Sequence, residues 1–203
     1  MFTRQGLLLT WKEIRPYFMF SLILFFAGLV IGGTPGAPSE FLDQQMAGLQ
    51  AIASSIGGSD NPEMTGFMLI TWNNIRVSLL VMGLGLIAGI MPLFVLVTNG
   101  MIVGYLLSKI SATGENVLLV VLKGLLPHAI FELSAVFLAC AFGIRFGMTL
   151  IKGIFGSAFG TKEPWAPFVR TATGAVPAVI AVVAFLLIGA LVESTITYWL
   201  VQS

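Results

Sequence analysis

The longest uncharged run in the chain is residues 77–108, which read VSLLVMGLGLIAGIMPLFVLVTNGMIVGYLLS. As one α-helix these 32 residues would extend about 48 Å, too long for one crossing of about 30 Å of hydrocarbon and too short for two full crossings with a loop. Pro92 and the Asn99-Gly100 pair are helix breakers inside the run. We therefore predict that one membrane helix covers about 67–90, that the chain turns at about Met91 and Pro92, and that a short helix covers 93–108.

The composition of the whole chain is that of a membrane protein. Of 203 residues, 57% are hydrophobic and 9% are charged, with a mean hydropathy of +0.98. A soluble domain carries about 25% charged residues, so an ordinary soluble enzyme and a disordered chain are both excluded. The net charge of +1 comes without a clustered basic face, so no nucleic-acid partner is expected. The length predicts one domain over residues 1–203.

Further apolar runs at 17–31, 118–144 and 174–192 supply the remaining crossings. Together with 67–90 and 93–108 they predict an all-α, polytopic helical bundle of about five transmembrane segments, with kinked or re-entrant helices. Five pairs of glycines four residues apart predict close helix contacts within the bundle or between two copies of it: Gly28 and Gly32, Gly85 and Gly89, Gly100 and Gly104, Gly143 and Gly147, Gly156 and Gly160.

The distribution of charge predicts the orientation. The loop at about 34–66 contains four acidic residues and no basic one, whereas the loop at about 145–173 contains four basic residues and one acidic one. By the positive-inside rule the second loop and the amino terminus are cytoplasmic, and the first loop and the carboxyl terminus are extracytoplasmic. Residues 143–160 mix cations with long apolar residues, which is typical either of an interfacial helix or of a cytoplasmic extension of the fourth helix.

The outer loop is predicted to contain an amphipathic helix that ends at Gly57-Gly58. Its apolar stripe is suited to packing on the bundle, to lying on the membrane surface, or to docking an external partner. The stripe consists of residues that repeat at alternating steps of four and three: Leu42, Met46, Leu49, Ala53 and Ile56.

Polar chemistry is concentrated in the fourth predicted span, where residues 125–133 read LLPHAIFEL. His128 and Glu132 are four residues apart and share one face of a helix. Pro127 cannot donate to the carbonyl of Lys123, so it frees a backbone acceptor nearby. Ionisable groups inside a span generally mark a functional or structural polar site. The sequence therefore predicts a polar pocket, and two other patches are candidates to complete it: Asn73, Asn74 and Arg76, and Thr98, Asn99 and Gly100, where the glycine permits a distorted backbone.

Four interpretations of His128 and Glu132 stay open. The first is a structural network in which Glu132 accepts from His128, Arg76 or an asparagine. The second is a site for a divalent metal such as zinc; two ligands fall short of the usual three or four, so a twofold homodimer would have to supply the rest. The third is a proton or ion pathway. The fourth is catalysis, but the chain has no nucleophile motif, phosphate loop or His-Glu-x-x-His helix, so we expect no enzymatic activity.

The order of these motifs resembles that of the stage II sporulation protein M family. The resemblance covers roughly residues 17–200, and at Ala129 the chain departs from a pattern that commonly has glycine. It rests on Asn73-Asn74 before an apolar helix, Thr98-Asn99-Gly100 followed by Gly104, the Leu126-Pro127-His128-Ala129-Ile130-Phe131-Glu132-Leu133 stretch, and Gly143.

The resemblance implies a multi-pass protein of the bacterial plasma membrane that acts as a non-enzymatic scaffold. In endospore-forming bacteria the family member recruits two peptidoglycan-degrading partners, stage II sporulation proteins D and P, during engulfment. The resemblance also makes Asn74, Asn99, His128 and Glu132 the signature positions. The competing function is a transporter or channel-like protein in which the same residues line a path. The expected partners are then membrane lipids, the wall hydrolases and a second copy of the chain.

Overall fold

The computed structural model describes residues 2–193. Every regular element in this range is helical: α1 (Arg4–Gly32), α2 (Ser39–Gly57), α3 (Pro62–Leu84), α4 (Ile90–Ala112), α5 (Val117–Val120), the π-helical segment η1 (Val121–Leu125), α6 (Leu126–Ala158) and α7 (Ala166–Val192). Within the described part, five helical units are long and apolar enough to cross a membrane: α1, α3, α4, the continuous α5–η1–α6 unit, and α7. The prediction of an all-α, five-segment membrane bundle is confirmed.

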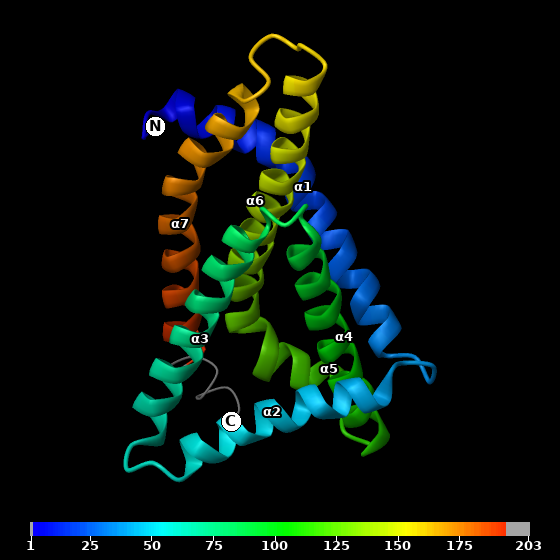
Figure 1. The fold of residues 1–203 in the computed structure, drawn as a ribbon. Coiled ribbons are helices and arrows are strands. Elements are labelled where there is room, and N and C mark those ends of the chain that lie inside the picture. The colour runs from blue at the N-terminus through cyan, green and yellow to red at the C-terminus, as the bar shows by residue number, and fades with distance from the viewer. Residues whose placement is uncertain (1, 194–203) are drawn as a thin grey trace.

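The two ends of the bundle differ (Figure 1). At one end α2 lies across the bundle, beside the end of α1 and the start of α3. At the other end lie the amino terminus and the connection between α6 and α7; we call it the basic end because Arg145, Lys152, Lys162 and Arg170 are there. The predicted position of the carboxyl terminus concerns residues 194–203, which lie outside the described residues. Which end faces the cytoplasm stays a prediction.

Glycines bring α1 and α4 together, backbone against backbone. A methyl group on Gly28 or Gly32 would overlap the carbonyl oxygens of Val97 or Met101 on α4. Gly100 faces α1 in the same way, because a methyl group there would overlap the carbonyl oxygen of Phe25. The distorted backbone that glycine would permit at Asn99-Gly100 is not present: α4 runs through both residues without a break, and the glycine serves close packing.

The turn between α3 and α4 comes earlier than the predicted Met91 and Pro92. It occupies residues 85–89 and ends at Gly89, whose φ is 74°, in the left-handed region that favours glycine. Pro92 lies in the first turn of α4. Backbone N–H groups there have no hydrogen-bond partner within the helix, so the missing N–H of proline breaks no helical hydrogen bond. The turn rests on α6, since a methyl group on Gly85 would overlap the backbone of Gly143. A methyl group on Gly147 would likewise overlap the backbone nitrogen of Gly89. The position of the turn is therefore set by its contact with α6.

The fourth span differs from the prediction at its far end. The predicted segment stops at 144 and a loop follows over 145–173, but α6 continues to Ala158 and α7 begins at Ala166. The helical extension is therefore the correct alternative, and the connection is only residues 159–165. The predicted kink is present: the π-helical η1 precedes Pro127, and Figure 1 shows the chain changing direction between α5 and α6.

The amphipathic helix predicted in the outer loop is α2, and part of its apolar stripe packs on the bundle. Leu42 is fully buried, and a methyl group on Gly66 of α3 would lie 3.4 Å from Cγ2 of Ile56. Leu49, however, is 50% exposed, so the stripe is only partly covered.

Candidate functional site

A cavity of about 360 Å³ lies between α1, α4 and the η1–α6 segment. Its walls are mostly apolar, with Phe25, Leu29 and Val103 among them. Four polar side chains also line it: Asn74 from α3, Asn99 from α4, and His128 and Glu132 from α6. The fold thus brings together the four positions that the sequence analysis selected, although they are spread over 59 residues of the chain.

Glu132 accepts a hydrogen bond from an asparagine. The Nδ2 of Asn74 lies 3.4 Å from Oε1 of Glu132, which joins α3 to α6 at the cavity wall. Of the donors considered in the sequence, Arg76 does not line the cavity and lies on the exposed side of α3. The close approach of α7 depends on Gly189, where a methyl group would lie 2.8 Å from Cγ of Glu132. The carboxylate therefore lies where three helices meet.

Asn99 is held by its own helix. Its Nδ2 donates to the backbone carbonyl of Val95, 2.9 Å away in the preceding turn of α4, a pattern that asparagine can adopt in a helix. The neighbouring Gly100 faces α1 and does not line the cavity. Asn99 therefore contributes a polar wall to the cavity, whereas Gly100 contributes packing.

His128 lies one turn before Glu132 on α6, and both interact electrostatically with Glu193, the residue that follows α7. The sequence analysis missed Glu193 because it ended the last span at residue 192. A carboxylate directly after an apolar run was the signal that could have found it. The cavity wall thus contains one imidazole and one carboxylate, both from α6, and Glu193 does not line it.

The family model described as Stage II sporulation protein M matches residues 18–198. The chain belongs to this family. An uncharacterized protein of Methanocaldococcus jannaschii is 31% identical over 138 residues, which are 68% of this chain and 59% of that protein. The chain therefore spans less than two-thirds of the length of this relative. No solved structure matches.

All four polar residues of the cavity fall within the part matched by the stage II sporulation protein M model. The resemblance inferred from the motifs is confirmed, and with the five membrane-crossing units it establishes a multi-pass membrane protein. Ala129, the departure from the family pattern, is buried in the cavity wall. Its methyl group is accommodated there, so a bare backbone is not required at this position.

Other predicted site residues of this family member lie outside the cavity. Asn73 and Arg76 are on the exposed side of α3, and Pro127 is in the first turn of α6. Among the described residues, no group of three or more His, Cys, Asp or Glu side chains is placed to hold a metal ion. A metal at His128 and Glu132 therefore still needs ligands from a second copy, and that arrangement stays a prediction.

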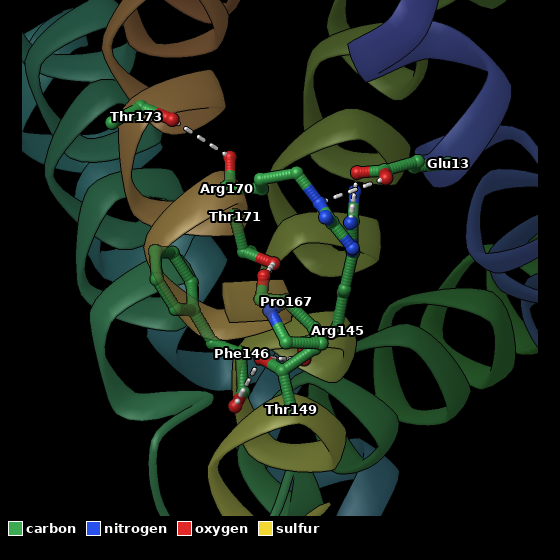
Figure 2. A network of polar contacts seen from close by, with 8 residues as sticks. All are labelled: Glu13, Arg145, Phe146, Thr149, Pro167, Arg170, Thr171 and Thr173. Carbon is green, nitrogen blue, oxygen red and sulfur yellow. Dashed lines mark hydrogen bonds and ion pairs between the residues drawn. The ribbon is translucent and has the colours of Figure 1, made fainter. Parts of the chain in front are cut away.

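A second polar centre of this family member lies at the basic end, and the sequence analysis missed it (Figure 2). Glu13 of α1 lies between two arginines: Nη2 of Arg145 donates to its Oε2, and Nε of Arg170 lies 3.2 Å from its Oε1. The Arg145 side chain is only 6% exposed. From the sequence, both arginines belong to the basic loop predicted at about 145–173. The one sequence signal was a single acid among the basic residues that begin the chain.

Proposed function

We propose that this protein is a non-enzymatic membrane scaffold that holds peptidoglycan-degrading partners at the α2 end of its bundle. The observation that carries the proposal is the way α2 is held. Tyr105 of α4 donates to Asp43 of α2 at 2.8 Å, and Lys109 lies 3.5 Å from the same carboxylate. Together with the buried Leu42, these contacts fix α2 to the bundle. A helix anchored in this way presents a preformed surface and binds a partner without an ordering cost.

The outer surface of α2 suits a protein partner better than a lipid surface. It is polar and exposed at Gln44, Gln45 and Gln50, and the helix has acidic residues but no basic one. Anionic headgroups attract cations, so this composition does not favour adsorption to a membrane. Leu49 and Ile52 are 50% and 38% exposed and lie one turn apart. They add an apolar edge of the kind that contributes to protein interfaces.

The polar cavity has a structural role in this proposal. The Asn74–Glu132 hydrogen bond ties α3 to α6, and α3 directly follows α2. The cavity therefore helps to position the start of α3 and with it the α2 surface. A buried apolar cluster adjoins the cavity through Phe25, and its members on α6 lie between Glu132 and Arg145 in the sequence. The cluster consists of Phe25, Val81, Leu96, Phe137, Cys140 and Ile144.

The second candidate is a transporter or channel-like protein. The placement of His128 and Glu132 in the wall of a cavity favours it, because ionisable groups inside a membrane span can mark a proton or ion path. The apolar cluster stands against it, since a path needs polar lining across the whole bundle. Proteoliposomes discriminate the two: proton or cation flux that is lost in Glu132→Gln would support transport and contradict a purely structural cavity.

The scaffold is tested by photo-crosslinking in the native membrane. A photoreactive side chain at Gln45 or Gln50 of α2 should give adducts with peptidoglycan hydrolases, identified by mass spectrometry. The control is the same group at Ile23, which is exposed on the middle of α1 and should give only lipid adducts. Adducts with hydrolases at both positions, or at neither, would contradict docking on α2.

The proposed orientation places α2 outside the cell and the basic end in the cytoplasm. Single cysteines at Ser54 on α2 and at Ser157 near the end of α6 test it. A membrane-impermeant thiol reagent applied to intact cells should label the first and not the second. The native Cys140 is buried and should not interfere. Labelling of both cysteines from one side would contradict the five-segment topology.

A further inference from the structure

Two adjoining cavities lie between α1 and α7 at the basic end, away from the polar cavity described above. We propose that together they bind an anionic phospholipid, with the phosphate of the headgroup in the polar cavity and the upper part of an acyl chain in the apolar one.

The polar cavity has a volume of about 470 Å³, and its charged residues are Glu13 of α1 and Arg170 of α7. Thr10 and Thr173 add hydroxyl groups to its wall. The Thr173 hydroxyl already donates to the carbonyl of Arg170, at 3.1 Å. The hydroxyl of Thr10 and the guanidinium of Arg170 are therefore the donors that face a ligand.

The charge of this centre is positive, although it contains a carboxylate. Glu13 is shared by two arginines, and Arg145 alone neutralises it. Arg170 contacts Glu13 through Nε, and its side chain is 60% exposed, so its terminal nitrogens can bind a phosphate. Nη1 of Arg145 is buried and has no hydrogen-bond partner among the described residues.

The apolar cavity, of about 130 Å³, continues the polar one into the span. Both are lined by Thr10 and Gly174, so the two meet there. On α7 the polar cavity uses residues 170–174, whereas the apolar cavity reaches from Gly174 to Ala181, about two turns further from the basic end. Its other walls come from side chains such as Trp11, Leu138 and Phe142.

This order of surfaces matches an amphipathic anion. A phosphate needs cationic donors, and an acyl chain needs an apolar groove that begins directly beneath them. Basic pockets between membrane helices bind the headgroups of anionic lipids in this way. Outside the centre formed by Glu13, Arg145 and Arg170, the basic end has one acid, Glu163, and several cations: Arg4, Lys12, Arg15, Lys152 and Lys162. This excess of positive charge favours a net negative headgroup over a zwitterionic one.

The test uses the full chain, purified and delipidated in a non-ionic detergent. Native mass spectrometry gives the dissociation constant for phosphatidylglycerol, for phosphatidylcholine with the same chains, and for inorganic phosphate. We expect phosphatidylglycerol to bind most tightly. Phosphatidylcholine binding as tightly as phosphatidylglycerol would overturn selection of the headgroup. Phosphate binding as tightly as phosphatidylglycerol would overturn the lipid in favour of a free anion.

Two matched pairs of variants locate the site. Arg170→Gln should weaken phosphatidylglycerol binding about fivefold, whereas Lys162→Gln, which removes the same charge from the connection outside the cavities, should weaken it much less. Ala181→Leu fills the apolar groove and should also weaken binding, whereas Ala184→Leu on the exposed side of α7 should not. If the two variants of either pair changed the dissociation constant for phosphatidylglycerol equally, the proposed location of the site would be wrong. Because Ala181 makes no polar contact, this pair tests the proposal even if Arg170→Gln lowers the melting temperature.

Discussion

Asn74 on α3 and Glu132 on α6 are joined by a hydrogen bond of 3.4 Å between amide and carboxylate, beside a cavity lined by membrane-crossing helices. Inside a bilayer polar groups have few alternative partners, so the pair replaces part of the solvation that both have lost. The contact also links α6 to the helix that directly follows α2.

Loss of the Glu132 side chain should destabilise the protein. In Glu132→Ala the Nδ2 of Asn74 loses its carboxylate partner, and we expect the free energy of unfolding to fall by about 1 to 3 kcal/mol. The measurement is the melting temperature in detergent. Glu115→Ala, in the exposed connection between α4 and α5, is the control and should melt like the wild type. An unchanged melting temperature in Glu132→Ala would show that the carboxylate is not needed for packing.

The pair itself is measured by a double-mutant cycle. We expect Asn74→Ala and Glu132→Ala to be less than additive, with a coupling energy between about 0.6 kcal/mol, the average for hydrogen bonds between membrane helices, and about 1.7 kcal/mol, the largest value for such bonds. Asn73→Ala, on the exposed side of the same helix, should show no coupling to Glu132. Additive effects of Asn74 and Glu132 would mean that the two side chains act separately.

The contact between α1 and α4 should not tolerate a methyl group at its centre. Gly100→Ala would push Cβ into the carbonyl oxygen of Phe25, and overpacking of this kind costs about 1 to 3 kcal/mol. Gly83→Ala on α3 meets nothing within 4 Å and should be neutral or slightly stabilising, because alanine favours a helix. Thermal unfolding of the two variants decides the point, and equal melting temperatures would contradict the close packing.

The charge network at the basic end should depend strongly on its single acid. Glu13→Ala leaves the buried Arg145 guanidinium without its carboxylate, and removal of one partner from a buried ion pair costs about 3 to 5 kcal/mol. We expect a large loss of folded protein in a detergent stability assay. Glu40→Ala, on the exposed surface of α2, is the control. Equal stability of the two variants would show that Arg145 has another source of compensation.

A metal bound at His128 and Glu132 would be present in a fixed ratio to the protein chain. One chain supplies too few ligands at this pair, so a shared site on a twofold axis would contain one zinc per two chains. Elemental analysis of the purified wild type should then find this ratio, and His128→Ala should contain none. Negligible metal in both proteins would end the metal hypothesis.

Much of the architecture was readable from the sequence because the bilayer imposes lengths. An apolar run such as 174–192 has the length and composition of a helix that crosses the bilayer. The stripe through Leu42 could be assigned to an amphipathic helix from its spacing. The cavity residues were found for a related reason. A histidine, a glutamate and asparagines are costly in apolar surroundings, so their presence within apolar runs is enough to indicate a site.

Contacts between distant residues could not be read in the same way. The turn at 85–89 depends on Gly143 and Gly147, and no local pattern near Pro92 contains that information. Arg145 looked like a loop cation because its partner, Glu13, is 132 positions away. Glu132 had three candidate donors in the sequence, and packing selected Asn74 while it turned Arg76 outward.

The amino acid sequence alone thus determined that the chain lies in a membrane, how many times it crosses, and which polar residues lie within apolar spans. The reason is that the free energy of transfer of each segment from water to lipid depends on that segment's own composition. Tertiary structure decided which of those polar residues meet, where α3 turns into α4, and how Glu13 compensates Arg145. These outcomes depend on the distances between helices, and such distances exist only once the helices have packed.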